Sequence, residues 1–421
     1  MNNHSFAVKG TLCWCDEQRR LTVQQGYAVC ENGVSAGVFT ELPEHWRQLP
    51  VLDWGDALIL PGMVDLHIHA PQYPNLGLGM DKELIDWLNE RTFPEERKYK
   101  DLAYAERSYR IFVEDLVHSV TTRACIFATI HIPATLLLME LLEESGLCAY
   151  VGKVNMDRNA PDYLLEGSAE QAIQGTRRWL EESRRFQCIR PILTPRFVPS
   201  VTDGLMKSLG ELRREYELPV QSHLSENLSE IQWVRELSPE SRCYGDAYDR
   251  FGMFGGEGPT IMAHCIHSGE EELALIQERG VTIAHCPSSN TNLASGIAPV
   301  RRYLDLGLSI GLGTDVSGGS SLSLLRAITD AVQCSKLRWR LVDQSLAPLS
   351  VEEAFNLATR GGGSFFGKVG SFEPGFAFDA VVLDDKPERC ILPLTGRERL
   401  ERALYRNCPV QAKIVDGRRI F

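Results

Sequence analysis

The sequence predicts an α/β fold: a (β/α)8 barrel of the TIM type, joined to a small β-sandwich built from both termini. Eight short β-like segments recur between residues 57 and 317, and most are followed by a polar stretch with helical spacing. Alternating strands and helices favour parallel strands, and eight repeats is the number that closes a barrel. Further β-like runs lie in residues 1–56 and 371–421, and neither end is long enough to bury a core alone.

We therefore expect residues 61–365 to form the barrel and residues 1–60 plus 366–421 to form the composite sandwich. The predicted strands are residues 57–69, 121–130, 148–156, 189–197, 218–225, 259–267, 281–287 and 308–317. Between them, residues 168–185, 271–280 and 300–307 have the spacing of helices that bury one face.

Composition and charge exclude several classes of protein. The chain has 421 residues, of which 43% are hydrophobic and 24% charged, as expected for a globular protein with a large core. A formal net charge of -12 disfavours nucleic acid and anionic membranes as partners. The first residues lack a basic segment followed by an apolar one, and no 18 apolar residues run together. These features predict a cytoplasmic protein.

The twelve cysteines scatter through apolar runs, which is typical of reduced core thiols in a cytosolic protein. Cys13 and Cys15 form a C-x-C pair that could bind a metal, but no second pair lies nearby. We expect both to be core or surface thiols.

The segment PGMVDLHIHA (61–70) places His67 and His69 two positions apart on a strand, so both side chains point the same way. A hydrogen-bonded pair of core histidines would give the same pattern. Two other strand ends favour a metal site, because QSHLSE supplies His223 and GLGTDVS supplies Asp315 in an otherwise small, apolar run. A buried carboxylate needs a compensating cation, and three histidines with one aspartate suit catalytic Zn²⁺ or Fe²⁺ with a position left for water.

PGMVDLHIHA, SHLSE, MAHCIH and GTDVSGG resemble, in order, four signature segments of the amidohydrolase superfamily of metal-dependent hydrolases. FEPGFAFDAVVLD and KIVDGRRI resemble its closing sandwich segments. The resemblance implies a single metal ion, because strand four ends in TPRF instead of a bridging lysine, while Lys153 lies within strand three. The H-x-x-E formed by His223 and Glu226 resembles the deaminase branch of the superfamily.

The resemblance implies a division of roles. The metal lowers the pKa of a bound water, Asp315 accepts its proton, and Glu226 protonates the ring and the departing amine. His264 polarises the water or steadies the developing charge. Taken singly, Glu226 would more often be a surface acid at a helix start and Asp315 a turn residue. His131 and His267 are assigned to the rim or to caps. His285 is assigned to the pocket wall, with the core as the alternative, and not to the metal.

Gln72, Arg196 and Phe197 are candidates for substrate binding, together with the site residues His223, Glu226 and Asp315. The amide of a glutamine offers both a donor and an acceptor to a lactam edge. The planar guanidinium of an arginine can pair with a carbonyl or a ring nitrogen, and a phenylalanine ring can stack on a flat substrate. Gln72 and Arg196 each have a plainer interpretation, as a loop cap and as a rim salt bridge. Phe197, Trp87 and Phe93 could form a lid over the pocket, and packing is the plainer interpretation of all three.

The motif H-x-H-A-P-Q, the segment 81–96 and TPRF resemble the guanine deaminase family. This resemblance implies hydrolysis of guanine to xanthine and ammonia, a small purine base as partner, zinc as cofactor and a homodimer. Another aminohydrolase or chlorohydrolase acting on a triazine or purine-like ring is the first alternative, and a non-catalytic scaffold is the second. The other zinc deaminase fold is excluded, because neither H-x-E nor P-C-x-x-C occurs.

Overall fold

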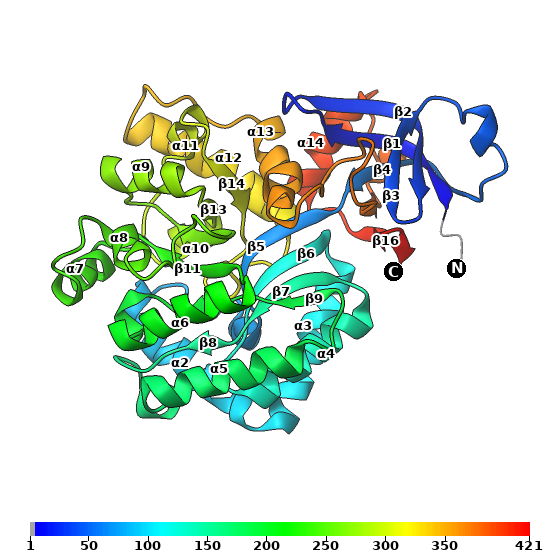
Figure 1. Cartoon of the computed structure of the whole chain (residues 1–421). Helices are drawn as coiled ribbons and strands as arrows, with labels where there is room; N and C mark the ends of the chain where they lie inside the picture. Colours follow the sequence, from blue (N-terminus) through cyan, green and yellow to red (C-terminus); the bar gives the residue numbers. More distant parts are fainter. Residues whose placement is uncertain (1–4) are drawn as a thin grey trace.

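The computed structural model describes residues 5–421, in which helices surround a ring of parallel strands and a separate sheet collects strands from both chain ends (Figure 1). The parallel strands are β5 (Met63–His69), β6 (Thr121–Phe127), β7 (Cys148–Gly152), β8 (Val154–Asn155), β9 (Ile189–Pro191), β10 (Thr194–Pro195), β11 (Val220–Leu224), β12 (Thr260–His264), β13 (Thr282–His285) and β14 (Ser309–Leu312). Each of the eight predicted segments contains at least one of them, so the predicted α/β class is confirmed.

Backbone hydrogen bonds link these strands around the ring. β5, β6, β7 and β9 form one parallel sheet and β11 to β14 another. The amide of Gln221 donates to the carbonyl of Leu193 at 2.9 Å, which joins the two sheets on one side. On the other side, the amide of Asp315 donates to the carbonyl of His67 at 2.8 Å. The last strand is thereby held against the first, and the carboxyl ends of all the strands face the same side.

Helices follow most of the strands, and their caps are encoded locally. They are α1 (Leu84–Trp87), α2 (Phe93–Glu96), α3 (Leu102–His118), α4 (Ile132–Ser145), α5 (Ala169–Ser183), α6 (Asp203–Tyr216), α7 (Leu228–Leu237), α8 (Tyr244–Asp249), α9 (Glu270–Arg279), α10 (Pro287–Asn292), α11 (Val300–Asp305), α12 (Leu324–Leu341), α13 (Val351–Asn356) and α14 (Gly396–Arg406). α5, α9 and α11 confirm the three predicted helices. α5, for example, begins with a reciprocal capping box between Ser168 and Gln171.

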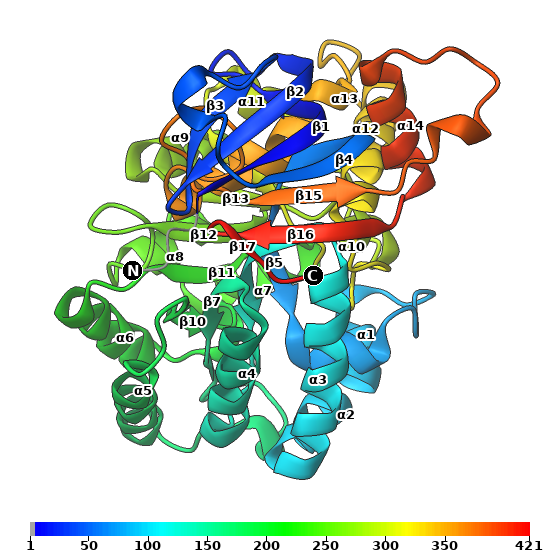
Figure 2. The ribbon, with the colours of Figure 1, turned by 90° about the vertical axis from the view of Figure 1, so that its right-hand side faces the viewer.

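The terminal sheet has the strand order β17-β16-β15-β4-β1-β2-β3, so three strands from the end of the chain join four from its beginning through the pair β15–β4 (Figure 2). Its strands are β1 (Phe6–Cys15), β2 (Leu21–Glu31), β3 (Val34–Phe39), β4 (Val51–Pro61), β15 (Ala380–Leu383), β16 (Val410–Val415) and β17 (Arg418–Arg419). The predicted union of both termini in one β unit is therefore confirmed.

This unit is one curled sheet with seven strands instead of two separate facing layers. Its β3 edge returns to the segment that precedes β15, since the amide of Ser35 donates to the carbonyl of Phe376 at 2.7 Å. The amide of Phe378 donates in turn to the carbonyl of Gly33 at 2.8 Å. The curl encloses its own apolar core, whose buried members are Val8, Leu12, Trp14, Ala28, Cys30, Ile59, Phe372, Phe378, Ala380, Val382, Ala412 and Ile414.

β4 leads directly into β5, with only Gly62 between the two strands. A Cβ atom at this position would lie 2.2 Å from Oγ1 of Thr122, so the close approach of β6 requires glycine. The terminal sheet and the strand that carries His67 and His69 are thus one continuous stretch of chain.

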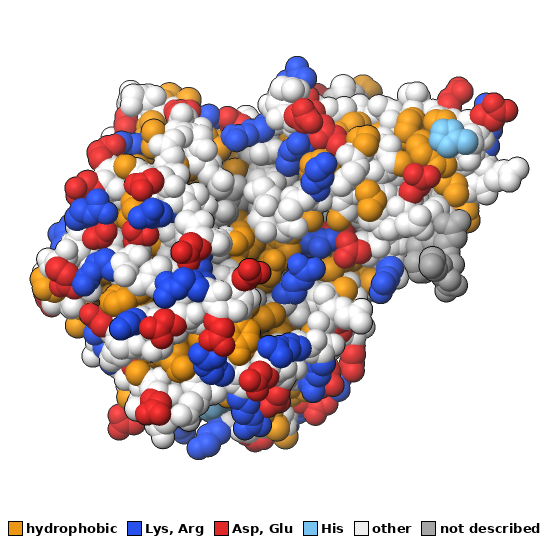
Figure 3. Space-filling view, in the orientation of Figure 1, with side chains coloured by type: hydrophobic (Ala, Val, Ile, Leu, Met, Phe, Trp, Pro, Cys, Tyr) orange, Lys and Arg blue, Asp and Glu red, His pale blue; other side chains and the backbone are white. Residues whose placement is uncertain are grey.

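The surface in Figure 3 intersperses acidic and basic side chains and carries no large basic field. Within residues 5–421, no helix has the length and apolar character needed to cross a bilayer. Cys13 and Cys15 are free thiols that are fully buried in β1, as expected of core thiols.

Candidate metal and catalytic site

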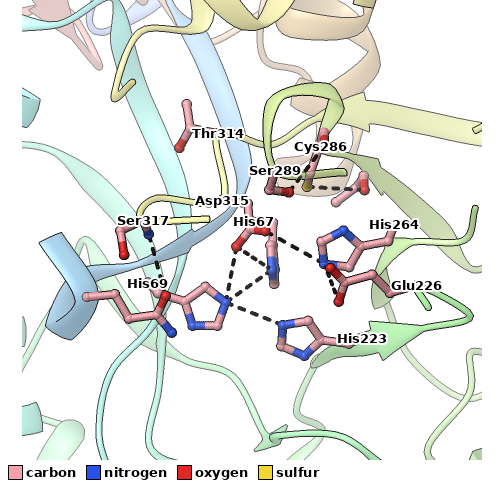
Figure 4. Close-up of polar contacts among 12 residues, drawn as sticks. His67, His69, His223, Glu226, His264, Cys286, Ser289, Thr314, Asp315 and Ser317 are labelled. Carbon is pink, nitrogen blue, oxygen red and sulfur yellow. Dashed lines mark hydrogen bonds and ion pairs between the residues drawn. The ribbon is translucent and has the colours of Figure 1, made fainter. Parts of the chain in front are cut away.

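The strand-end residues predicted as metal ligands converge on one point (Figure 4). Nε2 of His67 lies 3.2 Å from Nε2 of His69, which in turn lies 3.3 Å from Nε2 of His223. Oδ1 of Asp315 lies 3.3 Å from Nε2 of His67 and 3.4 Å from Nε2 of His69. Three elements that are distant in sequence, β5, β11 and the segment after β14, therefore present four ligand atoms to one another.

These residues fit a divalent cation. Ligands about 2.0–2.1 Å from a tetrahedral zinc ion stand roughly 3.3 Å apart, which is the spacing found here. Burial lowers the pKa of His69 and of His223 well below its usual value, so both imidazoles are neutral, as metal ligands must be. A divalent cation placed between these nitrogen atoms would satisfy their lone pairs together.

The predicted ligands are held by hydrogen bonds from neighbouring strands. Nδ1 of His223 donates to the carbonyl of Arg196 at 2.7 Å, which leaves Nε2 free to bind metal. The buried carboxylate of Asp65 accepts from the His67 amide at 3.2 Å and from the Thr314 amide at 3.0 Å, and so connects β5 to the segment that ends in Asp315. Burial raises the pKa of Asp65 to about 6. Sequence reasoning missed Asp65, although it precedes His67 by two positions on the same strand.

Glu226 and His264 lie beside the four predicted ligands, which we call the ligand group: His67, His69, His223 and Asp315. Nε2 of His264 is 3.4 Å from Oε2 of Glu226 and 3.8 Å from Oδ2 of Asp315. Nδ1 of His264 donates to Oδ1 of Asn290 at 2.8 Å, so the Nε2 atom faces the two carboxylates. Burial, reinforced by the charge of Asp315, raises the pKa of Glu226 well above its usual value. A carboxyl group in this setting can carry a proton at neutral pH.

A second buried glutamate, Glu230, is hydrogen-bonded to the main chain of Glu226. Oε2 of Glu230 accepts from the Glu226 amide at 3.2 Å and from the Asn227 amide at 3.3 Å, which completes the capping box of α7. Its Oε1 accepts from the hydroxyl of Tyr244 at 2.7 Å. Burial, and next the charge of Glu226, raises the pKa of Glu230 to about 7. The spacing N-x-x-E from Asn227 to Glu230 is typical of a capping box and could have predicted this contact, but it was not used in the sequence analysis.

A cavity with an empty volume of about 450 Å3, open mouth included, lies above the ligand group. It is lined by His69, Gln72, Leu84, Trp87, Leu88, Arg196, Phe197, His223, Glu226, Glu230, His264, Leu293 and Asp315. All six predicted substrate-binding residues are present, and Trp87 with three leucines supplies an apolar wall. This combination of a few polar groups and an apolar wall suits a flat heterocycle.

Other residues considered in the sequence lie elsewhere. His131 precedes α4 as its N-cap residue, and Nε2 of His267 lies 2.8 Å from the carbonyl of Ser295. His285, for which both the pocket wall and the core were open, is buried at the end of β13 and does not line the cavity, which agrees with the core alternative. Lys153 is buried and forms an ion pair with Glu166, away from the lining residues.

The amidohydrolase family model matches residues 58–420, which is most of the chain. The chain belongs to the amidohydrolase family. Among its amidohydrolase relatives, a guanine deaminase of Dictyostelium discoideum is 40% identical over 368 residues, covering 85% of this chain and 81% of the relative. A guanine deaminase of Escherichia coli (strain K12) is 37% identical over 380 residues, covering 87% and 81%.

Solved structures agree with these sequence matches. A crystal structure of guanine deaminase from C. acetobutylicum with bound guanine superposes on this amidohydrolase with a TM-score of 0.95 and 46% identity, covering 99% of this chain and 100% of the other. A triazine hydrolase reaches a TM-score of 0.85 at 16% identity, which is a likeness of fold alone.

Proposed function

We propose that this chain is a guanine deaminase, which hydrolyses guanine to xanthine and ammonia. The observation that carries the proposal is a single cavity in which a metal-ligand group, a proton-carrying glutamate and a Gln72–Arg196 wall face the same small space. The relatives named guanine deaminase, and the solved relative with guanine bound, support the same substrate.

The proposed ligands are His67, His69, His223 and Asp315, and the proposed cofactor is one zinc ion. When bound, the ion acts as a Lewis acid and lowers the pKa of a water molecule at the site. Asp315 accepts the proton that this water loses. Nε2 of His264 lies beside both Asp315 and Glu226, so it can orient the water and stabilise the charge that develops.

Glu226 moves the other protons. Its carboxyl group protonates a ring nitrogen next to the carbon under attack. The resulting carboxylate then takes the proton of the added hydroxyl group and delivers it to the amino group, which leaves as ammonia, and the proton held by Asp315 restores the carboxyl form of Glu226. The C–N bond to the exocyclic amine breaks and a C–O bond forms at the same carbon, so the water oxygen remains in xanthine. The raised pKa of Glu226 suits this alternation between acid and base.

Gln72 and Arg196 are the proposed partners of the ring edge, while Phe197 offers an aromatic wall. His223, Glu226 and Asp315 complete the substrate contacts. Residues 61–365 are the proposed catalytic domain, with residues 1–60 and 366–421 as its companion. We further propose a homodimer that acts in the cytoplasm in guanine catabolism.

The proposal is tested by incubating the purified, zinc-loaded chain with a panel of aminopurines and aminotriazines while ammonia and ultraviolet absorbance are followed. Guanine is expected to convert to xanthine at least about 100-fold faster than adenine, since a site built for a lactam leaves polar groups unpaired against an adenine ring. Preferential turnover of a triazine would favour the alternative aminohydrolase, and no ammonia from any ring would favour a scaffold.

Arg196→Ala is expected to raise KM for guanine about 10- to 100-fold, because charge-assisted hydrogen bonds to the ring are lost. Metal content should not change, since His223 is oriented by the main-chain carbonyl of residue 196 and not by its side chain. The matched control is Arg190→Ala, at an exposed position on β9. Unchanged KM and kcat in Arg196→Ala would remove this side chain from the substrate site.

A further inference from the structure

The two substrate-facing polar residues share one buried partner that sequence reasoning did not identify. Oε1 of Glu96 accepts from Nε2 of Gln72 at 3.0 Å, and Oε2 of Glu96 accepts from Nη1 of Arg196 at 2.6 Å. Glu96 is only 2% exposed and Arg196 only 4%. Glu96 does not line the cavity, so it acts on the cavity only through its two neighbours.

The helix that carries Glu96 makes a second contact with Arg196. Phe93 lies one turn before Glu96 in α2, and the guanidinium carbon of Arg196 stands 5.2 Å from the centre of its ring. A cation–π contact on the face and a salt bridge at the edge together restrict both the position and the plane of the guanidinium. Phe93 is thus a packing residue, which was the plainer of its two interpretations.

The carboxylate also fixes which way the Gln72 amide points. A carboxylate only accepts hydrogen bonds, so the Gln72 nitrogen turns towards Glu96 and the Gln72 oxygen turns away. The Oε1 atom of Gln72 has one long contact, 3.5 Å from the amide of Ser317. This oxygen therefore remains available as an acceptor next to the guanidinium donors of Arg196 that Glu96 does not use.

We propose that Glu96 is a positioning residue that sets the hydrogen-bond polarity of the cavity wall and so selects rings with an N–H group beside a carbonyl. The inference rests on the proposed function, because guanine presents such an edge through N1–H and its 6-oxo group. Adenine presents the opposite pattern, with an acceptor at N1 beside an amino group.

Glu96→Gln tests this with almost no change in shape. Arg196 can only donate, so the new amide must turn its oxygen to Arg196 and its nitrogen to Gln72. Gln72 must then rotate to accept, and it presents N–H groups to the cavity instead of its oxygen. The informative substrate pair is guanine and 2-aminopurine, because both lose a 2-amino group but 2-aminopurine has an acceptor at N1 and no carbonyl.

We expect Glu96→Gln to lower kcat/KM for guanine about 100-fold, mainly through KM, and to change that for 2-aminopurine much less. The ratio of the two kcat/KM values should therefore fall at least about tenfold. Glu90→Gln is the matched control. It removes a 57% exposed carboxylate of the same helical segment, which pairs with Lys82 at the surface, and should keep the wild-type ratio.

The reciprocal variant Gln72→Glu/Glu96→Gln keeps the total charge and returns an acceptor-only group to position 72. It should restore most of the wild-type ratio, and it provides the test if Glu96→Gln alone does not fold. An equal loss for both substrates in Glu96→Gln, or a ratio that the double variant does not restore, would reduce Glu96 to a structural role. Failure of the wild-type chain to deaminate guanine would instead contradict the proposed function.

Discussion

Glu226→Gln should reduce kcat for guanine by about 10²–10⁴-fold while the bound metal is retained. Glutamine keeps the size of the side chain but cannot carry a proton between the ring nitrogen and the amine. Glu226 lies 3.4 Å from His264 and is not among the four proposed ligands, so the ligand group stays intact. Steady-state kinetics and metal analysis of the same preparation measure both effects.

Glu236→Gln is the matched control for this substitution, because Glu236 is an exposed residue of α7, the helix that begins just after Glu226. It should leave turnover and metal content unchanged. Loss of metal together with activity in Glu226→Gln would make Glu226 a ligand and would overturn the role given to it. Near-normal turnover would assign the proton transfers to another group.

His223→Ala should lower both metal occupancy and turnover, the latter on the order of 10³-fold or more, because the remaining ligands no longer surround the ion. Removing metal from the wild-type chain with a chelator should abolish activity to a similar degree, and one equivalent of zinc should restore it. The same treatment should not rescue His223→Ala at that zinc concentration. Metal analysis and ammonia release provide the readouts.

His45→Ala is the control for removal of an imidazole, since His45 is an exposed residue of the terminal sheet unit. It should keep full metal occupancy and turnover. Full activity of the chelated wild-type chain would contradict the metal-dependent mechanism. Normal metal binding by His223→Ala would remove that residue from the ligand group.

The ligand group was predictable because its signals are local to each strand. His67 and His69 obey the two-residue period of a strand, and His223 and Asp315 each end a β-like run. Parallel strands bring their carboxyl ends to one side, so four local signals sufficed to predict one site. Gln72 and Arg196 could be predicted as cavity residues for the same reason.

Contacts that depend on tertiary placement could not be predicted in this way. Glu96 lies 100 positions before Arg196 in the chain, in the short helix α2. The alternation of side chains along a strand gives no information about where this helix lies in the fold. The shape of the terminal sheet could not be predicted either. The two-residue period of a strand shows which side chains share a face, but not whether the sheet curls on itself or packs against a second sheet. His285 is the last residue of β13, as His69 is the last residue of β5, yet only His69 lines the cavity.

The central position of β4 has a consequence for how the protein is made. β4 pairs with β15 from Ala380 to Leu383 and continues through Gly62 into the strand that bears the paired histidines. While the ribosome is still translating the middle of the chain, that edge of β4 has no neighbour. The support of the strand that bears His67 and His69 is therefore incomplete until residues 380–383 have been made and have paired with β4.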